Sequence, residues 1–304
     1  MTEYDVIIIG AGPAGLTAGI YAGRQGLKTL ILDKGVTGGA GLTVPNMENY
    51  PGFEIIPGIQ LIEHTKKQTL KYAEIKELEE VKDIEFIDKA RINVKTVKNE
   101  YETKSVIICT GTIHRKLGAL GESEFLGKGV FYCAVCDGPL FAGKKVFVVG
   151  GGNTAAQGAL FLDNIGSYVA LVHRRDELRA ETYLKEKLEE QDIPIIWDTV
   201  VDEIKGETLV KSVVLNHLKE DIKKEYDADG IYIAVGEIPV NEIAQNIGVE
   251  VDRGYIKTDK NQRTNIPFVY AAGDNTVGVR QWVVACGEGA VAALSAYDDL
   301  MKLK

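Results

Sequence analysis

Strand-like and helix-like hydrophobic patterns alternate along the chain, and the alternation occurs twice. Residues 5–9 form a continuous apolar run that stops at Gly10, and such a run predicts a strand buried on both faces of a parallel sheet. A helical stretch at 16–25 and a strand at 28–32 follow it. The same succession returns over residues 146–149, 156–164 and 168–172. The pattern predicts an α/β fold with two βαβ units.

The two units are copies of one pattern. They align without a gap at an offset of 140 residues, which takes Gly10 to Gly150 and Gly12 to Gly152. In such a turn the first glycine allows the tight bend, the second lets the backbone approach a pyrophosphate, and the third lets the helix pack on the strand. Ala155 holds the third position of the second turn, a change that this dinucleotide-binding fingerprint tolerates. We therefore predict two Rossmann-like domains of the three-layer ββα type.

The residues that end the second strand of each unit differ in charge. Asp33 ends the strand of the first unit, where a carboxylate can hold ribose hydroxyls. In the second unit His173 is followed by Arg174 and Arg175, and Arg179 lies four residues further on. Guanidinium groups bind a 2′-phosphate that a carboxylate would repel. We predict FAD or NAD in the first unit and NADP(H) in the second; a basic surface turn is the alternative.

A pair of cysteines precedes the second glycine-rich turn. Cys133 and Cys136 stand in a CxxC motif with Asp137 directly after them. Two such thiols can close a disulfide and exchange two electrons, and the carboxyl can supply or collect a proton. A zinc knuckle has the same spacing but needs two more ligands. Because Cys109 and Cys286 stand alone in apolar settings and no histidine has ligand spacing, the redox interpretation is favoured.

Composition and charge exclude several classes of function. The 304 residues suggest about two domains. A net charge of −9 without a Lys/Arg-rich block argues against nucleic acid or an anionic membrane as the main partner. We interpret the acidic run at 77–80 as a solvated face. No stretch reaches the ~18 apolar residues of a membrane span, and a strand begins almost at the N-terminus, so we expect a cytoplasmic protein without a signal peptide.

The remaining patterns complete the two domains. We expect residues 84–97 and 100–108 to form antiparallel strands in a small β layer over the first sheet. Further strands are expected at 193–201, 208–234 and 266–273, and a long apolar helix at 281–300. Asp274 follows the last strand, where it can cap a helix or meet a cofactor.

Two linkers define the domain organisation. Residues 112–117 and 235–241 leave the two sheets at matched positions. We predict that residues 1–113 and 242–304 form one domain and that 114–241 form a second domain inserted into it. Two linkers side by side form a hinge.

Short motifs occur in the order typical of one known family. They are GAGPAG at 10–15, GG at 38–39, ENYPG at 48–52, CTGT at 109–112, CAVCDG at 133–138, GGGNTA at 150–155, HRRDELRA at 173–180 and AAGD at 271–274. With these motifs the chain closely resembles the low-molecular-weight thioredoxin reductases, which are FAD- and NADPH-dependent disulfide oxidoreductases, over nearly its whole length.

The resemblance implies a set of site residues. Those expected around FAD are Gly10, Gly12, Pro13, Ala14, Gly15, Asp33, Lys34, Gly38, Gly39, Asn49, Thr110, Gly111, Gly273, Asp274, Arg280 and Gln281. Those expected around NADPH are Gly150, Gly152, Asn153, Thr154, Ala155, His173, Arg174, Arg175 and Arg179. By the same resemblance Cys136 lies nearest the flavin, Cys133 attacks the disulfide of the partner protein, and Asp137 is the acid–base partner.

The resemblance also implies a reaction and an assembly. Hydride passes from NADPH to FAD, and electrons pass to the Cys133–Cys136 disulfide and then to a thioredoxin-like or glutaredoxin-like protein. Family members are homodimers whose NADPH domain rotates against the FAD domain. Ala40 and Gln157 depart from the family's pattern, which leaves open another donor, such as reduced deazaflavin or ferredoxin, or another disulfide acceptor.

Other classes of protein fit the motifs less well. A peroxiredoxin-linked reductase of similar fold normally has an extra N-terminal redox domain, and a ferredoxin–NADP reductase of this type lacks the CxxC motif. A non-enzymatic dinucleotide sensor has little use for a thiol pair. Among the other chemically distinctive residues, we interpret His114 as an exposed side chain, with a hinge contact as the alternative. Trp282 is expected to pack, or to reach the flavin or a dimer interface.

Overall fold

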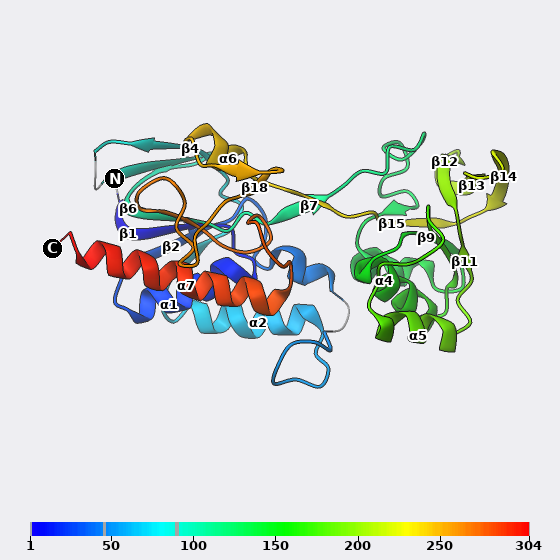
Figure 1. The fold of residues 1–304 in the computed structure, drawn as a ribbon, viewed down its shortest axis with the longest axis horizontal. Coiled ribbons are helices and arrows are strands. Elements are labelled where there is room, and N and C mark those ends of the chain that lie inside the picture. Colours follow the sequence, from blue (N-terminus) through cyan, green and yellow to red (C-terminus); the bar gives the residue numbers. More distant parts are fainter. Residues whose placement is uncertain (1, 45–46, 89–90, 304) are drawn as a thin grey trace. The chain divides into compact units, whose positions relative to one another are not determined.

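The structure, a computed structural model, describes residues 2–44, 47–88 and 91–303. The chain divides into two compact units, Met1–Ile113 with Ile238–Lys304, and His114–Glu237 (Figure 1). Each unit contains a parallel sheet with helices on one face and antiparallel strands on the other. The predicted fold class, with the second domain inserted into the first, is confirmed.

A seven-stranded sheet forms the centre of the first unit. Its path is β3-β2-β1-β6-β5-β4, and β19 pairs with β6. The strands are β1 (Thr2–Ile9), β2 (Thr29–Leu32), β3 (Glu74–Lys76), β4 (Val81–Phe86), β5 (Ile92–Thr96), β6 (Glu100–Ile108) and β19 (Val269–Ala271). Strand β1 pairs with β2 and β6 in parallel, whereas β4, β5 and β6 are antiparallel.

Strand β6 joins the parallel and antiparallel parts of this sheet. Its first half pairs with β5, where Thr103 lies opposite Ile92, and its second half pairs with β19, where Val106 lies opposite Val269. The expected β layer is therefore hydrogen-bonded to the first sheet through β6. Its hairpin still covers one face of the sheet, because β4 and β5 bury side chains in one cluster with β1 and β2.

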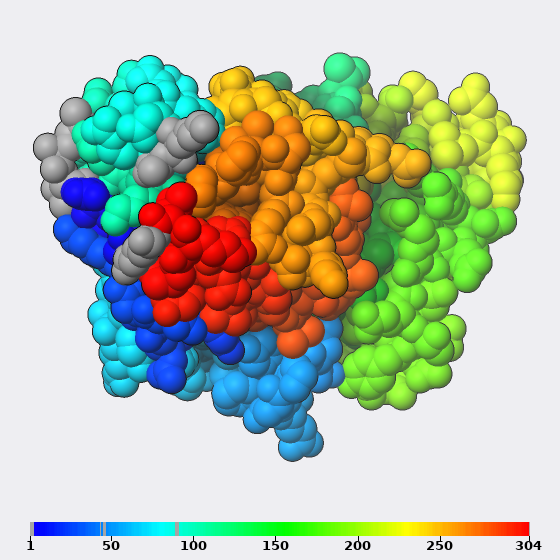
Figure 2. All heavy atoms as spheres, turned by 60° about the vertical axis from the view of Figure 1, so that its left-hand side comes forward, coloured from blue at the N-terminus to red at the C-terminus, as the bar shows by residue number. Residues whose placement is uncertain are grey.

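Three helices cover the opposite face of the first sheet. They are α1 (Pro13–Arg24), α2 (Gly58–Thr69) and α7 (Trp282–Met301), and they lie side by side in Figure 1. Small buried residues such as Ala18 in α1 and Ala292 in α7 allow the helices to approach closely. The shorter elements of this unit are the 3₁₀ helix η1 (Gly39–Thr43), α6 (Glu242–Asn246), β17 (Val251–Asp252) and β18 (Tyr255–Ile256). Figure 2 shows the C-terminal part of α7 (red) and the segment before this helix (orange) at the surface.

The second unit repeats the plan with a smaller sheet. Its parallel strands follow the order β11-β10-β9-β15-β8, and a separate antiparallel sheet follows the order β12-β13-β14. The parallel strands are β8 (Val130–Phe131), β9 (Lys145–Gly150), β10 (Tyr168–Val172), β11 (Ile195–Ile196) and β15 (Gly230–Ala234). The antiparallel strands are β12 (Thr199–Gly206), β13 (Val210–His217) and β14 (Ile222–Asp227). The single stretch expected at 208–234 is thus three strands.

Helices α4 (Asn153–Asn164) and α5 (Thr182–Glu190) pack on one face of this parallel sheet, and the antiparallel sheet packs on the other. The short α3 (Ala134–Asp137) and the 3₁₀ helix η2 (Gly138–Phe141) follow β8. Helices α1 and α4 begin and end at positions that differ by the 140-residue offset, so the internal repeat is confirmed. Both begin three residues earlier than predicted, because Gly12 and Gly152 are themselves the residues that precede the first helical turn.

The segments that connect the two units pair with each other. Strands β7 (Thr112–His114) and β16 (Glu237–Pro239) form a two-stranded sheet. The second unit ends at Glu237, a little before the return expected at 241–242. Within the described part of the chain, no helix combines the length and the hydrophobicity that crossing a membrane requires.

The interpretation of the acidic run at 77–80 as a solvated face was wrong. Glu79 is only 4% exposed, and its Oε1 accepts hydrogen bonds from Thr96, Asn99 and Tyr101. The carboxylate of Glu77 accepts the backbone N–H of Thr37 and forms a short ion pair with a lysine of α2. The run was misread because its partners lie on strands and loops that are distant in the sequence.

We expect Gly289→Ala to destabilise the protein and Gly287→Ala to leave its stability unchanged or slightly higher. Both glycines lie in α7. A methyl group at Gly289 would lie 2.2 Å from the carbonyl oxygen of Ala14 in α1, whereas one at Gly287 would meet no atom within 4 Å. Overpacking costs about 1–3 kcal/mol, and Ala in place of Gly inside a helix stabilises by up to ~1 kcal/mol. Denaturant unfolding checks this, and equal stability of the two variants would contradict the close α1–α7 contact.

Candidate functional site

The first glycine-rich turn has the geometry that the fingerprint requires. Gly10 has a φ of 107°, and a Cβ there would lie 2.1 Å from the carbonyl oxygen of Cys109. A Cβ at Gly15 would lie 1.9 Å from the carbonyl oxygen of Gly10, so the helix packs directly on the end of the strand. A Cβ at Gly12 would meet nothing within 4 Å. The backbone at the start of α1 is therefore open to an approaching group.

The start of α1 is also suited to an anion. Gly12 offers no capping side chain, Pro13 is the first helical residue, and the first turn contains no acidic residue. The backbone N–H groups of the first turn and the positive end of the helix dipole thus lack a competing anionic side chain. This arrangement fits the pyrophosphate of a dinucleotide.

Asp33 and the Gly38–Gly39 turn border the same glycine-rich turn. The two carboxylate oxygens of Asp33 accept the backbone N–H groups of Ala11, at 2.6 Å, and Gly35, at 2.7 Å. A carboxylate has about four acceptor sites, so each oxygen can still accept a ribose hydroxyl. The backbone N–H of Gly38 donates to Ala11, and a Cβ at Gly39 would lie 3.4 Å from the Cα of Gly12. Lys34 between them is exposed.

Several residues that are distant in the sequence meet near the start of α7. The side-chain nitrogen of Asn49 donates to the side-chain oxygen of Gln281 at 3.3 Å. The guanidinium of Arg280 lies 5.0 Å from the centre of the Tyr255 ring. Trp282 packs edge-on against the Tyr50 ring and occupies the space beside Gly41. The predicted packing of Trp282 is therefore found within this unit.

The turn after β19 is held by two residues that the sequence analysis did not identify. The carboxylate of Glu288 in α7 accepts the backbone N–H of Gly273 at 2.7 Å, beside Asp274, and burial raises the pKa of Glu288. Asn275 donates to the hydroxyl of Thr110 at 3.2 Å and so joins this turn to residues 110–111. The sequence signal for Glu288 was an acidic residue inside an otherwise apolar part of the helix pattern. No comparable signal indicated Asn275.

The second glycine-rich turn repeats the first. A Cβ at Gly150 would lie 2.4 Å from the carbonyl oxygen of Ala234, and one at Gly152 would meet nothing within 4 Å. No side chain caps α4, and its first turn, which contains Thr154 and the buried Ala155, has no acidic residue. Asn153 exchanges two hydrogen bonds with Glu181, of 2.6 and 2.9 Å, which link the start of α4 to the start of α5.

His173 and the three arginines differ in placement. The His173 side chain is only 5% exposed, its ring fills the space where a Cβ of Gly151 would lie, and its Nε2 lies 3.0 Å from the carbonyl oxygen of Glu177. Burial lowers the pKa of His173 and so favours the neutral ring. In contrast Arg174, Arg175 and Arg179 are exposed. Among the described residues none of these three guanidinium groups has an ion pair, so they are available to an anion.

The CxxC motif forms a disulfide at the start of a helix. Cys133 and Cys136 are bonded to each other, with their Cα atoms 5.3 Å apart. Cys133 precedes the first turn of α3, and its sulfur accepts the backbone N–H of Cys136 at 3.0 Å. Burial raises the pKa of Asp137, the next residue. The two sulfurs therefore form a disulfide beside a carboxyl whose pKa is raised, which is what the predicted redox pair requires.

Comparisons with known proteins agree with this geometry. The family model described as pyridine nucleotide-disulphide oxidoreductase matches residues 4–289. The chain belongs to this family. The thioredoxin reductase of Bacillus subtilis (strain 168) is 40% identical over 99% of this chain and 96% of its own length. The solved thioredoxin reductases of T. acidophilum and Lactococcus lactis have TM-scores of 0.95 and 0.94, identities of 39% and 41%, and cover 99% and 98% of this chain and 100% and 99% of their own.

Thioredoxin reductases within the pyridine nucleotide-disulphide oxidoreductase family use FAD and NADPH, and the two glycine-rich turns fit these groups. Both are open at the start of an uncapped helix, which suits a pyrophosphate. The carboxylate of Asp33 suits free ribose hydroxyls, and the arginines after His173 suit a 2′-phosphate. The assignment of individual residues to each cofactor stays a prediction.

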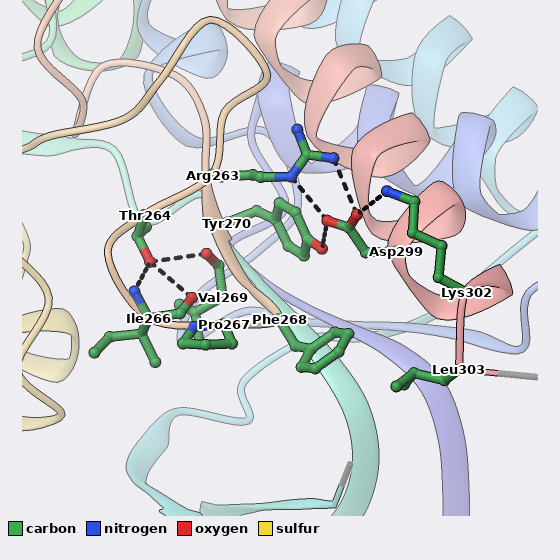
Figure 3. Close-up of a pocket in the computed structure, with 10 residues that line it drawn as sticks. All are labelled: Arg263, Thr264, Ile266, Pro267, Phe268, Val269, Tyr270, Asp299, Lys302 and Leu303. Atoms are coloured by element: carbon green, nitrogen blue, oxygen red, sulfur yellow. Dashed lines mark hydrogen bonds and ion pairs between the residues drawn. The ribbon is translucent and has the colours of Figure 1, made fainter. Parts of the chain in front are cut away.

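A surface pocket of the first unit shares no lining residue with these sites. It is lined by residues 263–264, by residues 266–270 and by residues at the end of α7 (Figure 3). The carboxylate of Asp299, one of its polar lining groups, accepts hydrogen bonds from Arg263, Tyr270 and Lys302. The Arg263 hydrogen bonds lower the pKa of Asp299 to about 2. Because this carboxylate is fully engaged, we interpret the cluster as a tie between α7 and the segment before it.

Metal binding has no support in the described ranges. No group of three or more His, Cys, Asp or Glu side chains there could hold a metal ion. Cys109 is buried, and Cys286 is partly buried with its sulfur 3.9 Å from the carbonyl oxygen of Pro13. Burial raises the pKa of both thiols, which keeps them protonated and poorly reactive.

Replacement of Arg174 and Arg175 by Ala is expected to weaken NADPH binding and to leave NADH binding nearly unchanged. Hydrogen bonds to charged groups contribute about 1.5–3 kcal/mol each, which corresponds to a loss of roughly ten- to hundredfold per arginine. The measurement is the dissociation constant of each dinucleotide for the wild type and the double variant. An equal loss for NADPH and NADH would show that the arginines do not bind the 2′-phosphate.

Proposed function

We propose that this protein is an NADPH-dependent thioredoxin-disulfide reductase. Electrons pass from NADPH through FAD to the Cys133–Cys136 pair and then to the disulfide of a thioredoxin-like protein. The observation that carries the proposal is the Cys133–Cys136 disulfide, which lies in the same unit as a glycine-rich turn flanked by arginines. The other unit repeats this turn with an aspartate in place of the arginines. Among the described residues, nothing favours another donor or another acceptor.

FAD supplies the two-electron step when bound, because it accepts a hydride and passes on an electron pair. The chain's own residues prepare both ends of that transfer. The open starts of α1 and α4 bind the two pyrophosphates, and the carboxylate and the arginines at the strand ends distinguish the two dinucleotides. This charge difference disfavours a 2′-phosphate at Asp33 and favours one beside the arginines.

The residues around the disulfide control its opening. The backbone N–H of Cys136 points at the sulfur of Cys133 from the start of α3, and this N–H and the helix start stabilise a thiolate on Cys133 once the disulfide opens. Cys133 is then the sulfur that attacks the disulfide of the partner protein, and Cys136 closes the bond again. Asp137 keeps a proton to a higher pH than an ordinary carboxyl and can give it to the departing sulfur.

We propose two further properties, which the family resemblance supports. The first is a homodimer, which light scattering on the purified protein tests directly. The second is a cytoplasmic location, because a pair that must cycle between dithiol and disulfide suits a reducing compartment.

The variant Cys133→Ser is expected to lose reduction of thioredoxin and to keep reduction of the bound flavin by NADPH. Serine cannot attack a disulfide, whereas the dinucleotide turns remain intact. Stopped-flow flavin absorbance and a coupled thioredoxin assay separate the two steps. The matched control is Cys286→Ala, which removes a cysteine outside the pair and should retain both. Thioredoxin turnover in Cys133→Ser would show that the assigned roles are wrong.

The variant Asp137→Asn is expected to slow dithiol–disulfide exchange by roughly 10²–10⁴-fold, because a general acid contributes about that much. The raised pKa of Asp137 means that the carboxyl is protonated below that pKa and loses its proton as the pH rises through it. The wild-type rate of acceptor reduction should therefore fall as the pH rises through this pKa. This pH dependence should be absent in the variant. An unchanged pH profile would remove Asp137 from the acid–base role.

A further inference from the structure

Tyr132, directly before Cys133, is held by a buried carboxylate. Its hydroxyl donates to Oε1 of Glu122, a residue that is only 4% exposed. The same carboxylate accepts the backbone N–H of Leu117 at 2.8 Å and that of Gly118 at 2.6 Å. Burial raises the pKa of the Tyr132 phenol, so the hydroxyl stays a donor. Glu122 therefore ties the residue before the redox pair to the chain that enters the second unit.

The face of the Tyr132 ring is held by a stacking contact. The imidazole of His114 stacks on the Tyr132 ring, with 5.5 Å between the ring centres and 11° between the planes. His114 is the last residue of β7, and its neighbour Arg115 donates its backbone N–H to Gly236 on the returning segment. The interpretation of His114 as an inert exposed side chain was wrong. It connects the entry strand of the second unit to the redox segment.

These contacts fix the backbone on the N-terminal side of Cys133. Phe131 is already held by its pairing with Tyr232 of β15, so Tyr132 is the last residue before the pair that needs an anchor. When the disulfide opens, the only covalent restraint between the two sulfurs is the short chain that joins them. A fixed backbone keeps the sulfurs close and lowers the entropy that is lost when they bond again.

We propose that Tyr132, Glu122 and His114 form a brace that positions Cys133 in the dithiol state and thereby favours closure of the Cys133–Cys136 disulfide. Tyr132 and Glu122 are positioning residues that act through the backbone of Cys133. The inference rests on the proposed function only in assuming that the cysteine pair reduces the disulfide of a partner protein. The closure equilibrium itself is measurable without NADPH or a partner protein.

The test is the dithiol–disulfide equilibrium of the FAD-loaded protein against dithiothreitol. Closure forms the bond between Cys133 and Cys136 and breaks that of oxidised dithiothreitol, and two electrons and two protons pass from the protein thiols to the reagent. Acid quenching, alkylation and peptide mass spectrometry count the free thiols at these two positions. The other two cysteines lie on separate peptides and do not interfere.

Tyr132→Phe removes the hydroxyl bond but keeps the ring, and Glu122 keeps its two backbone donors. We expect the equilibrium constant for closure to fall roughly three- to tenfold, which raises the potential of the pair by about 15–30 mV. His114→Leu removes the stacked ring and keeps the hydroxyl bond, so it should shift the equilibrium in the same direction. If Tyr132→Phe does not fold, His114→Leu carries the test.

The matched control is Tyr168→Phe, a tyrosine of β10 in the same unit that is 71% exposed. It should leave the closure equilibrium unchanged. A wild-type equilibrium in both brace variants overturns the proposal, even if their thermal stability falls, because a merely structural role lowers stability without changing the potential. A shifted equilibrium in a protein that fails to reduce thioredoxin would support the brace and contradict the proposed function.

Discussion

The structure depends on one close approach of backbone to backbone, made once in each unit. A Cβ at Gly10 would lie 2.1 Å from the carbonyl oxygen of Cys109, and one at Gly150 would lie 2.4 Å from that of Ala234. The first carbonyl directly follows the neighbouring parallel strand β6, and the second is the last of the neighbouring parallel strand β15. Any larger residue would push the turn away from the sheet. The helix that follows each turn then begins at the sheet edge with its first N–H groups open to a phosphate.

The local part of this arrangement could be predicted from the sequence. Strand, glycine-rich turn and helix are adjacent in the chain, so the pattern predicts both glycine-rich turns and the 140-residue offset between them. The change from Asp33 to a histidine with two arginines is equally local, and it predicts which dinucleotide each turn binds. The pairing of Cys133 with Cys136 also needed only short-range geometry, and the disulfide is found.

Contacts between distant segments could not be predicted from a single sequence. Glu79 was expected in solvent because its own neighbours are acidic, but its partners come from a hairpin some twenty residues away. Glu288 supports the turn at Gly273 from α7, and Asn275 ties the same turn to the end of β6. The stacking of His114 on Tyr132 likewise required the fold, since neither residue has a motif that indicates the other. All of these residues act through contacts with other segments of the chain.

We propose that electrons from NADPH reach the cysteine pair only through the flavin. The most direct test is to add NADPH without oxygen to FAD-loaded and FAD-free protein and to count the free thiols at Cys133 and Cys136 by alkylation. We predict that both thiols appear in the FAD-loaded protein and that the pair stays a disulfide in the FAD-free protein. Thiols that form without FAD, or a disulfide that persists with both cofactors present, would contradict it.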